Sequence, residues 1–319
     1  MLSNKVNPQV NIPFDPATGA VIAPAPGEGA GHWAGAAGAF ADGEDVYLVY
    51  RLRWPRPRRG GELIVARGDG ETFEAVWRAR REDFASPSIE RCAILREGGS
   101  WRLYVSYVDG VDGRWRVDLI EAGSPSAFDP RTRRPVLDAD MANAIAVKDP
   151  WLRRVNDRWL MFVSFGERYG LAERLHGAGD ALSTGAVKSE TGLATSIDGL
   201  RWTWEGRIFA AASSGWDRFT TRLTTAVPIP GGEWLGLYDG SASVEENYEE
   251  RCGLARSPDL LRWTRIGDRP LLGSAGGPGT IRYVESLAIG ERVLFFYERT
   301  RRDGAHELCL SEAPRDKAG

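Results

Sequence analysis

The sequence predicts an all-β fold, a five-bladed β-propeller made of four-stranded antiparallel blades. One pattern occurs twice, GLATSIDGLRWTW at residues 192–204 and GLARSPDLLRWTR at residues 253–265, and the two copies are 61 residues apart. Each copy follows two short apolar segments that are separated by a tight-turn signal. A unit of four strands in roughly 50–60 residues has the size of a propeller blade. The repeat therefore predicts blades arranged around a common centre.

The third and fourth units show the pattern in full. The turn between their first two strands is Asn-Asp in the third unit and Gly-Gly in the fourth, and both are hairpin signals. The GLA segment then forms the third strand, and the residues after the tryptophan form the fourth. The expected first and second strands are residues 144–155 and 158–167 in the third unit, and residues 222–230 and 233–240 in the fourth.

The turn before the last strand of each of these units carries an aspartate and a tryptophan. We expect Asp198 and Asp259 to accept hydrogen bonds from the turn backbone. We expect Trp202 and Trp263 to wedge between neighbouring blades. Turns of this kind occur in many propellers, so they indicate the fold and not the chemistry.

The same order of strands recurs more faintly in three further units, and the last unit ends after its third strand. We expect the segment around residues 10–23 to supply the missing strand and close the ring, which leaves no exposed sheet edge. A short helix is expected within the loop 168–190, and the Gly-rich segment 273–280 is interpreted as a linker between blades. The prediction is one domain over residues 1–319, with blades at approximately 30–80, 86–138, 142–210, 216–272 and 278–314.

Composition and missing motifs exclude several functions. A net charge of −3 over 319 residues disfavours a nucleic-acid scaffold or a polybasic membrane binder. No apolar run reaches the about 18 residues of a membrane span, so a soluble cytoplasmic protein is expected. No phosphate-binding loop, dinucleotide motif, nucleophile elbow or zinc spacing occurs, so no cofactor or metal ion is predicted and the expected partner is a small-molecule substrate. Cys92, Cys252 and Cys309 lie far apart and are expected to be buried, reduced thiols.

Chemistry is expected where the innermost strands of the blades converge on a central funnel. Charged residues stand there at positions where a core strand would be apolar, and burying an unpaired charge is costly. Asp149 leads the candidates, because Pro150 fixes the entry of its strand and restricts Asp149 to an extended conformation. The candidate catalytic residues are Asp149, Glu285 and Glu90, and the candidate substrate-binding residues are His32, Trp33, Arg91, Lys148, Trp151, Arg222, Arg282 and Tyr283. The alternative is a ring of structural ion pairs that plugs the channel.

Several carboxylates that face one funnel are what glycosyl transfer requires. One protonates the leaving oxygen, and another activates water or attacks the anomeric carbon. Burial and mutual repulsion can separate their pKa values. The basic residues predict an anionic substrate or co-substrate, such as a uronic acid, a sugar phosphate or inorganic phosphate, because guanidinium groups bind carboxylates and phosphates with paired hydrogen bonds. In the alternative, they pair with Glu90, Asp149 and Glu285.

With these features, the chain resembles the five-bladed β-propeller glycoside hydrolases, the arabinanase-like and invertase-like group that includes families 43, 32, 117 and 130. The resemblance covers nearly the whole chain as a blade pattern, and its specific residues are KDP at 148–150 and the turns SIDGLRW and SPDLLRW. It implies that Asp149 stabilises the transition state or tunes the acid. The chain departs from the group where a first-blade acid is replaced by His32 and a fourth-blade acid by Arg222. The candidates to take their place are Glu90, Glu285, and the pair Glu245 and Glu246.

The leading hypothesis is a glycoside hydrolase-like enzyme, a glycosidase or a glycoside phosphorylase, that cleaves a small neutral or anionic glycoside in the funnel. The alternatives are non-hydrolytic, because a propeller by itself does not decide function. One is a carbohydrate-binding protein, which the two missing acids favour. The other is a tailoring enzyme that performs lyase, isomerase or cyclisation chemistry on a non-sugar metabolite, which His32 and the basic lining favour.

Overall fold

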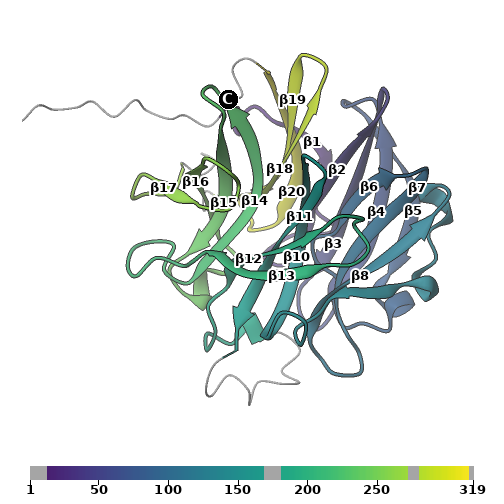
Figure 1. Cartoon of the computed structure of the whole chain (residues 1–319), viewed down its shortest axis with the longest axis horizontal. Coiled ribbons are helices and arrows are strands. Elements are labelled where there is room, and N and C mark those ends of the chain that lie inside the picture. Colours follow the sequence, from purple (N-terminus) through teal and green to yellow (C-terminus); the bar gives the residue numbers. More distant parts are fainter. Residues whose placement is uncertain (1–12, 169–180, 272–279, 316–319) are drawn as a thin grey trace, which may run out of the picture.

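The computed structural model of the chain describes residues 13–168, 181–271 and 280–315 (Figure 1). These residues form β-strands and a few short 3-10 helices. The helix expected within the loop 168–190 falls at residues 171–179, outside the described residues. Residues 10–12 of the expected N-terminal strand and residues 273–279 of the expected linker also lie outside them.

Within the described residues, the strands form three four-stranded sheets and one eight-stranded sheet, and the predicted all-β fold is confirmed. The four-stranded sheets consist of β6 (Ala93–Glu97), β7 (Ser100–Val108), β8 (Trp115–Ala122) and β9 (Arg134–Leu137); of β10 (Ala144–Val155), β11 (Arg158–Glu167), β12 (Glu190–Ser196) and β13 (Thr203–Phe209); and of β14 (Thr220–Ile229), β15 (Glu233–Ser241), β16 (Arg251–Ser257) and β17 (Thr264–Ile266). The eight-stranded sheet consists of β1 (Ala20–Ala23), β2 (Trp33–Asp42), β3 (Asp45–Trp54), β4 (Arg59–Gly68), β5 (Phe73–Arg80), β18 (Ile281–Ile289), β19 (Arg292–Thr300) and β20 (His306–Pro314).

The predicted hairpins of the third and fourth units are confirmed. β10 and β11 begin and end at the predicted residues, and the two-residue turn between them places Asn156 at a left-handed φ of 53°. Asparagine tolerates this conformation better than most residues do. β14 and β15 differ from their predicted bounds by no more than two residues, and their turn includes Pro230 in addition to the two glycines.

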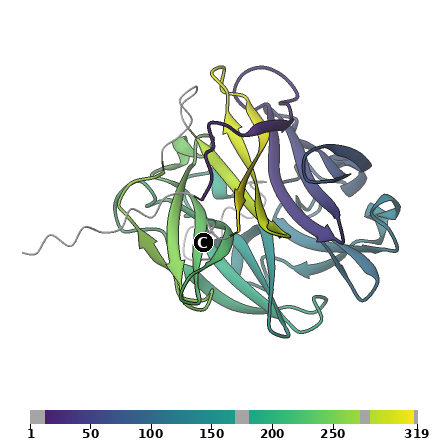
Figure 2. The same ribbon diagram turned by 90° about the horizontal axis from the view of Figure 1, so that it is seen from above.

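The sheets are arranged around a common centre, as the blades of a propeller are (Figure 2). The first strands of the successive groups contact one another there: β2 contacts β6 and β18, β6 contacts β10, and β14 contacts β18. Residues at the starts of strands that are distant in the sequence are thereby brought close together.

The eight-stranded sheet is composed of two four-stranded groups. β2, β3, β4 and β5 form one group, and β18, β19, β20 and β1 form the other. In the described part of the chain, the only pair that joins the two groups is Trp33 with His306, in parallel orientation. β1 pairs antiparallel with β20, with Ala20 opposite Leu310, so the N-terminal residues lie beside the last group as its fourth strand.

Apolar clusters fill the space between neighbouring groups of strands, and both repeated tryptophans contribute to them. Trp202 is 7% exposed and lies edge-to-face against Tyr104 of β7, with ring centroids 6.0 Å apart. Trp202 thus packs against a residue of the preceding sheet. Trp263 is partly buried at the edge of the cluster between the third and fourth groups. The predicted packing role of both residues is confirmed.

The two repeated aspartates organise their turns through backbone hydrogen bonds. Asp198 accepts hydrogen bonds from the backbone N–H groups of Leu200 at 2.7 Å and Arg201 at 2.9 Å. Asp259 accepts the equivalent two bonds at 3.0 and 2.9 Å. Backbone hydrogen bonds lower the pKa of Asp198 to about 2, so the ionised form that accepts these bonds is present at neutral pH.

The three cysteines are buried, free thiols, as the sequence predicts. Burial raises the pKa of each thiol, which leaves none of them prepared to act as a nucleophile. Among the described residues, no helix has the length and apolar character needed to cross a membrane.

We expect Trp202→Ala to lower the free energy of unfolding by about 3–5 kcal/mol, because a large side chain that is buried between two sheets is lost. Trp263→Ala should cost less, since Trp263 is only partly buried. Urea unfolding followed by circular dichroism measures both values. Equal losses for the two variants would contradict the difference in packing.

Candidate functional site

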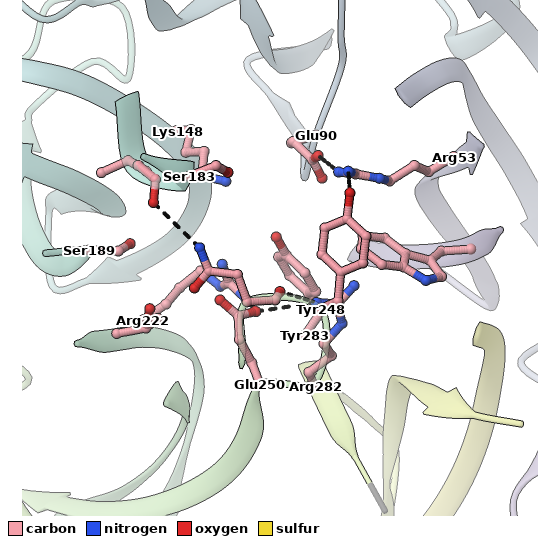
Figure 3. A pocket seen from close by; sticks show the side chains of 14 residues that line it. Arg53, Glu90, Lys148, Ser183, Ser189, Arg222, Tyr248, Glu250, Arg282 and Tyr283 are labelled. Atoms are coloured by element: carbon pink, nitrogen blue, oxygen red, sulfur yellow. Dashed lines mark hydrogen bonds and ion pairs between the residues drawn. The ribbon is translucent and has the colours of Figure 1, made fainter. Parts of the chain in front are cut away.

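A small cavity lies where the inner strands begin (Figure 3). Its volume is about 40 Å³. This is room for a few water molecules and far below the about 300 Å³ at which small-molecule sites begin. The lining residues are Trp33, Arg53, Glu90, Lys148, Leu182, Ser183, Ser189, Thr220, Arg222, Asn247, Tyr248, Glu250, Arg282 and Tyr283. A sugar-sized ligand therefore enters only if lining side chains move.

Six of the predicted site residues line this cavity. They lie at or near the starts of β2, β10, β14 and β18, and in the segment before β6. These residues are Trp33, Glu90, Lys148, Arg222, Arg282 and Tyr283. The convergence of the first strands, which the repeat predicts, is the reason that residues from such distant parts of the chain meet.

Asp149 lies directly behind the cavity wall and is only 1% exposed. The hydroxyl of Tyr283 donates a hydrogen bond to its Oδ2 at 3.3 Å, and Arg222 Nη1 lies 3.4 Å from the same oxygen. Lys148 Nζ is 3.6 Å from that oxygen, and the backbone N–H of Arg91 donates to Oδ1 at 3.3 Å. Asp149 thus contacts three lining residues without lining the cavity itself.

The backbone of Asp149 corrects one prediction. Its φ is 58°, in the left-handed region, and the residue is not extended. The register of β10 and β11 shifts between Lys148 and Trp151, so Asp149 belongs to a bulge. The following proline disfavours the right-handed helical region, but that restriction does not remove the left-handed one. A buried hydrogen bond from the Asp149 N–H to Ser106 Oγ at 3.2 Å holds this conformation.

Three predicted residues lie further along the channel. Glu285 and Arg91 form a buried ion pair, with Arg91 Nη2 2.6 Å from Glu285 Oε2. Trp151 packs against Phe162 in the core, with ring centroids 4.7 Å apart. The structure therefore does not bring Glu285 into the cavity that Glu90 lines.

His32 is partly exposed and also stays out of the cavity. Its Nδ1 lies 3.4 Å from the backbone oxygen of Gly29. The imidazole near the site belongs to His306, which stacks on Trp33 with centroids 4.9 Å apart. His306 Nδ1 lies 3.0 Å from a carboxylate oxygen of Glu298. The two histidines are neighbours in space through a backbone hydrogen bond, from the His306 N–H to the His32 oxygen.

A chain of alternating arginines and carboxylates runs along the cavity. Glu90 binds Arg53 at 2.9 Å and Arg51 at 2.8 Å. Arg51 and Arg282 both bind Glu298, at 2.9 and 2.8 Å. The links so far join side chains of β3, β18 and β19 with the segment before β6.

The same chain continues through Glu250, which precedes β16. Arg282 Nη1 lies 3.4 Å from Glu250, and Arg222 donates a hydrogen bond to Glu250. Arg222 also binds Asp239 at 2.7 Å and reaches Asp149 at 3.4 Å. One guanidinium group therefore faces three carboxylates.

Sequence reasoning missed several members of this network. They are Arg51, Arg53, Asp239, Glu250 and Glu298. A signal for three of them is visible: β3, β15 and β19 each carry a tyrosine followed directly by a charged residue within an apolar stretch. Strand pairing then places Asp239 opposite Arg222 and Glu298 opposite Arg282.

Burial and ion pairing together set the protonation of the buried groups. Burial raises the pKa of Glu90, but Arg51 and Arg53 outweigh this effect and hold the pKa well below its usual range. Arginines have the same net effect on the pKa of buried Glu298. Burial raises the pKa of Tyr283 well above its ordinary value, so its hydroxyl keeps its proton. Glu90 is thus ionised at neutral pH, and Tyr283 keeps a hydroxyl group that can donate a hydrogen bond.

The aromatic side chains of the lining are covered by arginines. The guanidinium carbons of Arg282 and Arg53 lie 4.2 and 4.3 Å from the ring centroid of Trp33, and that of Arg222 lies 3.9 Å from the centroid of Tyr283. Such contacts are favourable cation–π interactions. Across the described residues, no group of three or more His, Cys, Asp or Glu side chains is placed to hold a metal ion.

Comparison with known proteins identifies the fold. No family model matches the sequence, and no curated protein matches it. Among solved structures, one described as a glycoside hydrolase has a TM-score of 0.67 at 14% identity, over 93% of this chain and 91% of its own. The chain has the fold of the propeller glycoside hydrolases. The resemblance that the sequence indicates is confirmed at this level.

Two further structures support this conclusion. A thermostable family-43 glycoside hydrolase has a TM-score of 0.61 at 11% identity, over 88% of each chain. The β-1,2-mannobiose phosphorylase from Listeria innocua, in complex with β-1,2-mannobiose, has a TM-score of 0.60 at 12% identity, over 91% of each chain. At such low identity the likeness concerns the fold alone.

Asp239 provides a pH test of the charge network. Burial raises the pKa of Asp239 from 3.8 to about 6. The attraction of Arg222 opposes this rise, and the repulsion of Glu250 adds to it. The folded state therefore binds this proton more tightly than the unfolded state does. The stability contributed by Asp239 should fall as the pH rises from about 4 to about 6.

The asparagine side chain of Asp239→Asn does not ionise, so the stability of this variant should lack the fall between about pH 4 and about pH 6 that is due to Asp239. We expect the wild type to lose free energy of unfolding relative to the variant across that pH interval, measured by urea unfolding. A difference between the two proteins that is constant with pH would show that Asp239 ionises normally in the folded state.

Proposed function

We propose that this protein is a glycoside hydrolase-like enzyme that cleaves a small anionic glycoside in the cavity of Figure 3. One observation carries the proposal: the carboxylates of Glu90 and Glu250, from two different groups of strands, line one cavity together with four cationic side chains. Glycosyl transfer uses two carboxyl groups placed around the anomeric carbon. The fold shared with glycoside hydrolases supports the same class of chemistry.

We further infer a single domain of five blades. The two halves of the eight-stranded sheet count as separate blades, because one residue pair joins them in the described chain. Apolar clusters lie between successive groups of strands, including one between the first group and the last. A ring in which β1 completes the last blade accounts for that cluster.

In this proposal Glu90 is the base or the nucleophile. Arg51 and Arg53 keep its carboxylate ionised. An ionised carboxylate can accept a proton from water or attack the anomeric carbon directly. Its side chain lines the cavity, so it can reach a bound substrate.

Glu250 is the acid in this proposal, and the substrate's own charge activates it. In the structure, Arg222 and Arg282 bind the Glu250 carboxylate. An anionic substrate that pairs with these arginines releases the Glu250 carboxyl group from its present partners, so that it can face the leaving oxygen. Asp149 acts as a positioning residue, through its contacts with Arg222 and Tyr283.

A second function, without hydrolysis, is favoured by the pairing of the same acids. Glu90 and Glu250 each contact two arginines, as structural ion pairs do. A carbohydrate-binding protein, or a tailoring enzyme for a non-sugar metabolite, would keep these pairs and use the cationic lining for binding alone.

The first test is cleavage in oxygen-18 water. The wild type is incubated with neutral, uronic and phosphorylated glycosides, with and without phosphate, and the products are analysed by mass spectrometry. We expect labelled product, and a loss of about 10²–10⁴ in kcat/KM for Glu250→Gln, the range for a general acid. Glu245→Gln is the matched control: Glu245, a candidate from the sequence, is exposed and does not line the cavity, so this variant should keep the wild-type activity.

Other results of this test separate the functions. Cleavage that depends on phosphate and carries no label would indicate a phosphorylase. Binding without turnover by the folded wild type would reject the hydrolase in favour of the second function.

Lys148 tests the charge of the substrate. Its Nζ contacts one carboxylate, that of Asp149, at 3.6 Å, and the residue lines the cavity. Lys148→Met should lower kcat/KM by about 10- to 100-fold for an anionic glycoside, the effect of losing one hydrogen bond to a charged group. Its effect on the matched neutral glycoside should be much smaller. Equal losses for both substrates would contradict an anionic substrate.

A further inference from the structure

A second cavity lies further along the same inner strands, and its volume is about 300 Å³. Residues of β2, β6, β10 and β18 line it, several positions beyond those that line the first cavity. An apolar cavity of about 150 Å³ holds one benzene molecule. The second cavity therefore has room for a ring with a short substituent.

Most of its wall is apolar. Phe40, Leu95, Trp151 and Leu287 come from four different inner strands and contribute apolar side chains. A sugar would leave many hydroxyl groups without partners against such a wall, at a cost for each one. A ligand with an apolar body suits this cavity better.

Three charged side chains also line the second cavity: Arg153, Arg154 and Glu285. Two of them have partners of opposite charge. Glu285 pairs with Arg91 at 2.6 Å, and Arg154 pairs with Glu97 at 2.8 Å. The charges of Glu285 and Arg154 are therefore balanced within the protein, without a ligand.

Arg153 is the third of these charges. In the part of the chain that the structure describes, no carboxylate forms an ion pair with it, and its guanidinium carbon lies 4.9 Å from the ring centroid of Trp234. Burial lowers the pKa of Arg153, and the attraction of Glu285, which lines the same cavity, partly opposes this effect. Arg153 is only partly exposed and lines the cavity, so an anion bound there can pair with its guanidinium group.

We propose that the second cavity binds a small carboxylic acid with an apolar body, whose carboxylate pairs with Arg153 and whose hydrocarbon part lies against Phe40 and Leu287. The ligand enters a site that is distinct from the first cavity, because the two cavities share no lining residue. This proposal does not depend on the glycosidase function.

Calorimetric titration with 3-phenylpropionate and its neutral amide tests the proposal. The acid should bind the wild-type protein at least about tenfold more tightly than the amide, as expected when an ionic hydrogen bond is added. Arg153→Gln should remove this preference, and Arg153→Lys, which keeps the charge, should retain part of it. Circular dichroism checks that each variant is folded.

Two matched variants locate the binding. Arg158→Gln removes an exposed arginine from the same hairpin and should leave the affinity for 3-phenylpropionate unchanged. Lys148→Met removes a cation from the first cavity and should also leave it unchanged.

Three results would overturn the proposal. The first is equal affinity for the acid and the amide. The second is loss of binding in Lys148→Met together with retention in folded Arg153→Gln, which would place the probe in the first cavity. The third is the absence of binding heat at about 10 mM probe, a concentration at which even millimolar affinity is measurable.

Discussion

The centre of this protein depends on the pairing of buried charges. The network of arginines and carboxylates runs from Arg53 through Glu298 and Glu250 to Asp239, and its members are at most 5% exposed. Leaving one buried ion without a partner costs several kcal/mol. Each guanidinium of the network faces a carboxylate from another strand or segment, and this pairing favours the observed arrangement of the inner strands. Charge pairing and the apolar clusters between the sheets thus favour the same architecture.

The groups that hold the centre together are also the groups that line the first cavity. Arg222 and Arg282 bind Glu250 and also cover the faces of Tyr283 and Trp33. A ligand cannot simply be added to such a site, because its lining charges are already paired. It must replace one of the partners, and an anion can replace a carboxylate without leaving an arginine unpaired. The proposed preference for an anionic substrate and the proposed activation of Glu250 both follow from this exchange.

The fold is that of glycoside hydrolases, but the acidic residues reach the centre from other places. The sequence has His32 and Arg222 where the resemblance leads one to expect acids. In the structure, Asp239 lies opposite Arg222 on the neighbouring strand, and Glu250 approaches from the segment before β16. The inner strand of the fourth group thus contributes Arg222 to the centre. The carboxylates that pair with Arg222 come from β15 and from the segment before β16.

The sequence by itself determined the repeat, the hairpins, the turn roles of Asp198 and Trp202, and six of the residues that line the first cavity. These features are local or repeat at a fixed spacing, so they can be recognised without knowing which strands pair. Only the tertiary structure decided that Asp149 sits in a left-handed bulge, that His306 and not His32 approaches the site, and that Glu285 belongs to the second cavity. The position of a side chain along the channel depends on strand register and on bulges. Ion-pair partners such as Arg91 and Glu285 are separated by 194 residues in the sequence. No pattern within one strand records such a contact, because the packing of several sheets around the centre creates it.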